Sequence, residues 1–66
     1  MTLIERISKN INTRRQNMSV DRLSKIADIP VSTLWHIIGN QVKDVKLSTM
    51  IAIAKALKCT VDDLLK

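Results

Sequence analysis

The amino-acid sequence predicts an all-α protein built from five short helices. Its 66 residues include one glycine, one proline, no tyrosine and no phenylalanine, so the residues of tight turns and the tyrosine and phenylalanine that are common in strands are scarce or absent. Apolar residues recur three and four positions apart, as on one face of a helix, and show little alternation. A chain of this length organises one hydrophobic core, so we expect a single domain over residues 1–66.

The first two helices are predicted from apolar spacing and from a capping residue. The first runs from about Thr2 to Arg14 or Arg15, and its apolar face carries Leu3, Ile4, Ile7 and Ile11. Ser19 is typical of a helix N-cap, so a second helix is expected over Val20–Ala27. Its inward positions are Val20, Leu23 and either Ile26 or Ala27.

The third helix is predicted to begin at Pro30 or Val31. Proline restricts Ile29 to extended conformations and has a φ that suits the first turn of a helix. The predicted apolar face is made of Leu34, Ile37 and Ile38. Trp35 and His36, the only tryptophan and the only histidine of the chain, fall outside this face.

Two further helices are expected after a loop. Gly39 and Asn40 end the third helix, since both tolerate the left-handed conformation. A fourth helix is predicted from about Leu47 to Lys58, with an apolar face of Leu47, Met50, Ile51, Ala54 and Leu57. Ile53 lies off this face, which would place it under the fifth helix or in a dimer interface. Thr60 and Asp63 have the spacing of a capping box, which starts a short fifth helix over Val61–Leu65.

Residues Val20–Ile38 have the spacing of a helix-turn-helix. Two helices that meet at a steep angle need a small residue where they cross, and Ser24 occupies that position. Residues 28–30 supply a short turn, in which Ile29 provides an apolar side chain for the core. The same spacing also fits an ordinary αα-hairpin of a small bundle, so spacing alone leaves both interpretations open.

Two segments carry a pattern that is found in a known family. The first has matching residues at Ser19, Leu23, Ser24, Ile29, Pro30, Ser32, Thr33 and Leu34. The second is Leu47–Leu65, which contains an IAKAL run and a TVDDLL ending. Together they resemble the Cro/cI-type (XRE) helix-turn-helix family. The resemblance implies a lambda-repressor-like DNA-binding domain, with its helix-turn-helix at about residues 20–38. It also implies a sequence-specific transcriptional regulator, most often a homodimeric repressor, whose third helix enters the major groove of double-stranded DNA.

Carried over position by position, the resemblance predicts two groups of DNA-contacting residues. The base-contacting group is Pro30, Val31, Ser32, Trp35 and His36. The phosphate-contacting group is Arg14, Arg15, Ser19, Val20, Asn40, Gln41 and Lys43. Many relatives have glutamine where this chain has Val20 and Val31. Valine forms no side-chain hydrogen bond, so Val31 could contact only a thymine methyl group.

Two other departures fall at helix ends. Asp28 stands where relatives usually have a turn glycine, and Gly39–Asn40 reverses the usual order of an asparagine followed by a glycine. Both aspartate and asparagine adopt the left-handed conformation more readily than other non-glycine residues, so we expect the fold to tolerate these changes.

Trp35 and His36 each have two interpretations. Trp35 packs over the edge of its helix, contacts DNA through its indole N–H to a phosphate or its ring against a thymine methyl group, or does both. His36 is either a solvated residue without a role or a base contact. Cys59 is expected to be a core thiol, because a small apolar residue belongs at its position.

Composition narrows the class of function. Lysine and arginine number 11 against 6 acidic residues, a net charge of +5, which favours a polyanionic partner such as nucleic acid. One cysteine and one histidine are too few for a tetrahedral zinc site, so no metal or other cofactor is expected. No secretory leader or apolar run of about eighteen residues is present, which favours the cytoplasm. Paired catalytic groups are missing too, so we expect neither an enzyme nor a small-molecule ligand.

A second hypothesis is a protein-interaction module, such as an antitoxin-like partner for which DNA binding is secondary. Such a partner usually needs a segment outside the DNA-binding fold, and five helices take up residues 1–66. The regulator hypothesis is therefore preferred. RNA binding is disfavoured, because the stacking aromatics of single-strand readers are missing.

Overall fold

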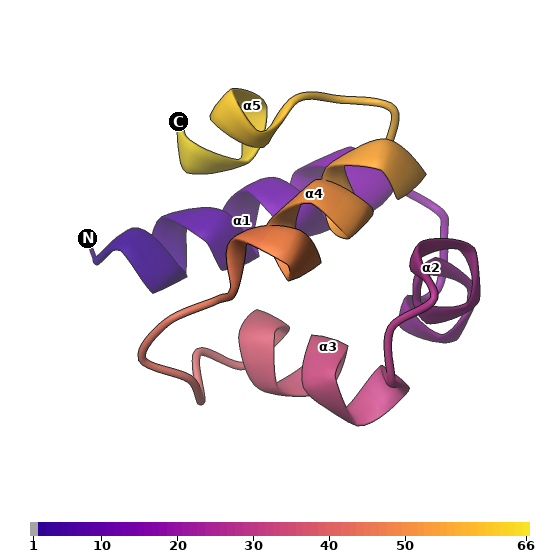
Figure 1. The fold of residues 1–66 in the computed structure, drawn as a ribbon, viewed down its shortest axis with the longest axis horizontal. Coiled ribbons are helices and arrows are strands. Elements are labelled where there is room, and N and C mark those ends of the chain that lie inside the picture. Colours follow the sequence, from indigo (N-terminus) through magenta and orange to yellow (C-terminus); the bar gives the residue numbers. More distant parts are fainter. Residues whose placement is uncertain (1) are drawn as a thin grey trace.

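A computed structural model describes residues 2–66, and within them it has five helices and no strand. The helices are α1 (Leu3–Arg15), α2 (Val20–Ala27), α3 (Val31–Ile38), α4 (Leu47–Ala56) and α5 (Val61–Leu65). Figure 1 shows α3 along one edge of the molecule and α5 along the opposite edge, with α1 and α4 between them. The predicted all-α, five-helix fold is confirmed for this part of the chain.

Side-chain caps start α2 and α5 at the predicted residues. The Ser19 hydroxyl accepts a hydrogen bond from the Arg22 N–H at 3.1 Å. The Thr60 hydroxyl accepts one from the Asp63 N–H at 3.1 Å, while the Asp63 carboxylate accepts one from the Thr60 N–H at 3.0 Å. The predicted capping box is thus formed in both directions. Because a cap satisfies N–H groups that have no intrahelical partner, it fixes the residue at which each helix begins.

Helices α2, α3 and α4 are each followed by a residue with positive φ that is not glycine. These residues are Asp28 (57°), Asn40 (59°) and Lys58 (58°). After each one, the next N–H bonds a carbonyl five residues earlier, as in the 3.0 Å bond from Ile29 to Ser24, which is the pattern of a Schellman motif. Gly39 itself has a φ of −84°. The reversed Gly39–Asn40 order therefore puts the left-handed residue at Asn40 alone.

All five helices contribute to one core. Its buried members are Ile7, Ile11, Val20, Leu23, Leu34, Ile37, Met50, Ile53, Ala54 and Leu64. The inward positions of α2 and α3 are those predicted, and of the two alternatives in α2 it is Ala27 that is buried and Ile26 that is exposed. Ser24 is also buried, as expected for the small residue where α2 and α3 cross. Cys59 packs against this core in a half-buried position.

The predicted apolar face of α4 is wrong at two positions. Leu47 is 66% exposed and Ile51 is 39% exposed, whereas Ile53, which was placed off the face, is fully buried. The helix also ends at Ala56, before the predicted Lys58. α4 packs against α2 and α5, and these neighbours select the face that carries Ile53. Apolar residues occur on most sides of this helix, so their spacing alone could not determine which side turns inward. Leu3, also predicted on an apolar face, is exposed at the start of α1.

Candidate nucleic-acid interface

One side of α3 is exposed along most of the helix. It carries Val31, Ser32, Trp35 and His36, which we call the outward face of α3. Successive residues of a helix are about 100° apart, so pairs four residues apart share one side. Val31 and Trp35 form one such pair, and Ser32 with His36 forms the next. These four belong to the predicted base-contacting group, and exposed Pro30 stands at the N-cap beside them.

Trp35 is 53% exposed. More than half of this large side chain is therefore available for contact with another molecule, and the rest is covered by the protein. Val31, one turn earlier, is 38% exposed. An exposed apolar pair of this kind offers surface for contact with another molecule.

The first N–H groups of α2 and α3 are free of intrahelical partners. In α2 the Ser19 hydroxyl takes the Arg22 N–H, which leaves the N–H groups of the two residues before it. In α3 the Pro30 carbonyl accepts from Thr33 and Leu34, and proline supplies no side-chain cap. Free N–H groups and the positive end of the helix dipole make such an end favourable for an anion such as phosphate.

A buried hydroxyl fixes the far end of α3. Ser8 of α1 donates to the carbonyl of Ile38 at 2.6 Å and is only 6% exposed. This bond satisfies one of the last carbonyls of α3, which have no intrahelical partner, and ties the helix to α1. Sequence reasoning missed Ser8, although it lies at helical spacing with Ile4 and Ile11 on an apolar face, where a lone hydroxyl needs a partner.

The predicted phosphate-contacting residues outside α1 are exposed, except for Val20. Ser19, Asn40, Gln41 and Lys43 are exposed, at the start of α2 and in the loop after α3. Val20 is 4% exposed and belongs to the core. The expectation of a phosphate contact is therefore corrected for its side chain, and only its backbone N–H is placed to take part.

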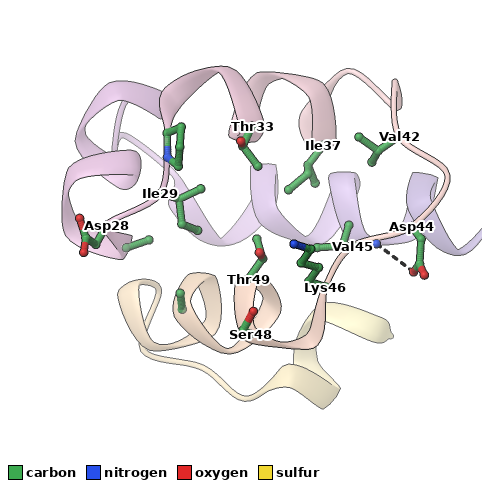
Figure 2. A pocket seen from close by; sticks show the side chains of 13 residues that line it. Asp28, Ile29, Thr33, Ile37, Val42, Asp44, Val45, Lys46, Ser48 and Thr49 are labelled. Carbon is green, nitrogen blue, oxygen red and sulfur yellow. Dashed lines mark hydrogen bonds between the residues drawn. The ribbon is translucent and has the colours of Figure 1, made fainter.

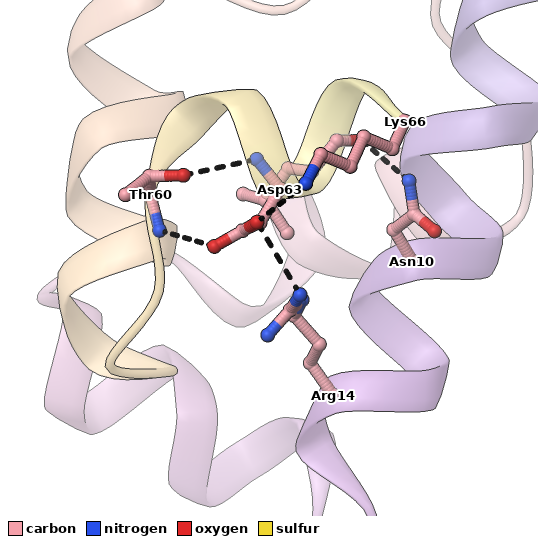
Figure 3. A network of polar contacts seen from close by, with 6 residues as sticks. Asn10, Arg14, Thr60, Asp63 and Lys66 are labelled. Carbon is pink, nitrogen blue, oxygen red and sulfur yellow. Dashed lines mark hydrogen bonds and ion pairs between the residues drawn. The ribbon is translucent and has the colours of Figure 1, made fainter.

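The two arginines at the end of α1 are both held by contacts within the chain. Arg15 donates from Nε to Asn12 at 2.9 Å and from Nη1 to the Met18 carbonyl at 2.8 Å, beside the start of α2. Arg14 instead lies 3.5 Å from the carboxylate of Asp63 (Figure 3). Because α5 lies on the opposite edge from α3, Arg14 does not belong to the outward face, and its phosphate contact stays a prediction.

A groove lies on the other side of α3, between this helix, the following loop and α4. It has a volume of about 490 Å³ and is lined by residues that include Thr33, Ile37, Val42 and Thr49. Figure 2 shows Thr33 and Ile37 pointing from α3 towards α4. Thr33 follows Val31 by two positions, about 200° around the helix. The groove and the outward face therefore occupy different sides of α3.

Other features give no sign of a metal or membrane site in the described residues. Between residues 2 and 66 there is no group of three or more histidine, cysteine, aspartate or glutamate side chains that could hold a metal ion. No helix in this range is long and apolar enough to cross a membrane. Burial raises the pKa of the Cys59 thiol, which reduces the thiolate fraction at neutral pH.

Two short helices joined by the turn 28–30, with the second exposed along its outer side, define a helix-turn-helix protein. A family model described as the Cro/C1-type HTH DNA-binding domain matches residues 6–66, so the chain belongs to this family of DNA-binding regulators. A search of curated proteins and a search of solved structures each found no match. The resemblance inferred from the two sequence segments is confirmed.

Proposed function

We propose that residues 1–66 act as one sequence-specific DNA-binding domain and that the protein is a homodimeric transcriptional repressor. It reads the major groove of double-stranded DNA with α3. The observation that carries this proposal is the outward face of α3, which is exposed along its length and begins at a helix end with free N–H groups. A helix presented in this way fits the width of the major groove.

Base contacts come from the outward face. The hydroxyl of Ser32 and the imidazole of His36 can donate to or accept from base edges. Pro30, Val31 and Trp35 contribute apolar surface, and the indole N–H of Trp35 can also donate to a phosphate oxygen. These roles require no catalytic step and no cofactor.

Phosphate contacts come from the segments before and after α3. Ser19 and the backbone N–H of Val20 lie at the start of α2, and Asn40, Gln41 and Lys43 lie in the loop after α3. Arg15 uses two donors within the chain, and a guanidinium has five, so it retains donors for a phosphate. The net charge of +5 supports a polyanionic partner.

A second copy of the chain would complete the regulator. Cro/C1-type helix-turn-helix proteins bind half-sites about one helical turn apart through a dimer. Leu47 and Ile51 lie four residues apart on the exposed side of α4, and they offer an apolar surface separate from the outward face. We expect such a regulator to act in the cytoplasm of a cell without a nucleus.

The phosphate contact of Lys43 provides a direct test. Lys43→Ala removes one cation from the loop after α3, so we expect weaker binding to every duplex sequence. The slope of log affinity against log salt concentration should become shallower by about 0.9 for each bound copy of the chain, or about 1.8 for the dimer, because each copy neutralises one fewer phosphate. Fluorescence anisotropy of a labelled duplex at several salt concentrations measures both quantities.

Lys55→Ala is the matched control, since it makes the same change of residue and charge on the exposed surface of α4. We expect its salt slope to equal that of the unmodified protein. Equal slopes for both variants would show that Lys43 contributes only to the overall charge.

A further inference from the structure

α3 lacks the side chains that grip a base most specifically. Its sequence, VSTLWHII, contains no arginine, lysine, asparagine or glutamine. These are the residues that form paired hydrogen bonds with guanine or adenine in the major groove. The hydrogen-bonding groups of the outward face are limited to the Ser32 hydroxyl, the His36 imidazole and the Trp35 indole N–H.

Apolar surface dominates the outward face instead. Val31 is 38% exposed and Trp35 is 53% exposed, and at a spacing of four residues their Cβ atoms lie about 5–6 Å apart. Basic residues border α3 in the chain on both sides and are all exposed: Arg22 and Lys25 in α2, Lys43 and Lys46 in the loop. Cations on the segments that flank a helix complement a duplex, in which bases lie between rows of phosphates.

The major groove presents one apolar group, the C5 methyl of thymine. We infer that Val31 and Trp35 recognise thymines through these methyl groups, so that methyl burial, rather than paired hydrogen bonds, supplies most of the base specificity of α3. This inference rests on the proposed function. Burying one methyl group corresponds to about a three- to fivefold gain in affinity.

The test compares thymine with uracil, which differs from it only by this methyl group. A duplex enriched from a random library is resynthesised with each thymine replaced by uracil, one position at a time. Its dissociation constant is measured near physiological salt, about 0.15 M. We expect one or two positions in each half-site to lose about three- to fivefold in affinity on losing the methyl group. Other positions should not respond.

Variants of the protein test whether Val31 and Trp35 cause the loss of affinity for uracil. Trp35→Ala and Val31→Ala should each bind the thymine duplex more weakly and should abolish the uracil penalty at one position. Leu3→Ala is the matched control, because Leu3 has the same 53% exposure as Trp35 but lies in α1. The Leu3→Ala variant should still bind the uracil duplex more weakly than the thymine duplex. Circular dichroism of each variant checks that the helices are retained.

The possible failures are distinguishable. In the first, a duplex is enriched and bound, but no uracil substitution changes its affinity by more than about 1.5-fold. That change is smaller than the effect of one buried methyl group. Methyl recognition is then overturned, while DNA recognition stands. A penalty that persists in both Trp35→Ala and Val31→Ala also overturns it. If no sequence is enriched, the proposed function fails, and the inference fails with it.

Discussion

Asp63 joins several parts of the structure through a single carboxylate. It accepts from the Thr60 N–H at 3.0 Å and lies 3.4 Å from Lys66 and 3.5 Å from Arg14. Figure 3 shows these contacts between α1 and the two ends of α5. The hydrogen bond from the Thr60 backbone is the main reason that the pKa of Asp63 lies below its usual value, with the Thr60 hydroxyl, Lys66 and Arg14 contributing further. All of these contacts favour the charged carboxylate.

This lowered pKa makes part of the stability dependent on pH. The pKa of Asp63 is lower in the folded state than in the unfolded state. Its charged carboxylate therefore contributes to stability above the unfolded pKa, and this contribution is lost as pH falls towards the folded pKa. We expect Asp63→Asn to lower the thermal midpoint at pH 7. The difference from the unmodified protein should shrink as pH falls through the usual aspartate range, near pH 4.

Asp62→Asn is the control, because it changes the neighbouring carboxylate in the first turn of the same helix. Its effect on the thermal midpoint should be smaller at pH 7. A gap between Asp63→Asn and the unmodified protein that is equal at pH 7 and pH 3 would contradict the role of the charge.

At the scale of single residues, sequence reasoning found the exposed side chains of α3 but not their partners. The apolar spacing of α3 placed Trp35 and His36 outside the core, as the structure has them. The ion pair between Arg14 and Asp63 joins helices that are far apart in the sequence. No local pattern in the sequence reports such a contact.

At the scale of elements, a left-handed residue other than glycine at a helix end is a position where a glycine would stabilise the fold. Lys58 has a φ of 58° after α4, a conformation that costs most residues about 1 kcal/mol and glycine much less. We expect Lys58→Gly to stabilise the protein by about 0.5–1 kcal/mol. For a domain of this size that corresponds to a rise in thermal midpoint of about 2–8 °C, measured by circular dichroism.

Lys55→Gly is the matched control, since Lys55 lies within α4 itself. The same replacement there should destabilise by about 0.5–1 kcal/mol, because glycine disfavours helices. Opposite signs for the two variants are the expected result, whereas destabilisation by both would show that the Lys58 conformation carries no strain.

Helix starts were more predictable than helix faces. Ser19 and Thr60 act through residues three positions away, so local sequence determines where α2 and α5 begin. The inward side of α4 depends on α2 and α5, which pack against it. The spacing of Leu47 and Ile51 with Met50 and Ala54 gave a regular helical face, but the contacts with the other helices buried Ile53 instead.

At the scale of the whole molecule, the two edges have different roles. The edge formed by α5 is held to α1 by the ion pair of Arg14 and by a 2.9 Å hydrogen bond from Asn10 to the carbonyl of Leu64. The opposite edge presents α3, which Ser8 ties to α1. Because α1 is bonded to both edges and packs against α3, it helps to orient the outward face of α3. A rigid helix of this kind can recognise a particular DNA sequence without first being ordered by binding.

Selection from a random duplex library at about 0.15 M salt tests sequence-specific binding by a dimer most directly. We expect enrichment of a palindrome whose half-sites are centred about 10 base pairs apart, one turn of the double helix. A dimer with one α3 in each half-site explains such symmetry. A bound fraction that does not depend on sequence, with no motif enriched after repeated rounds, would contradict recognition of DNA by the outward face of α3.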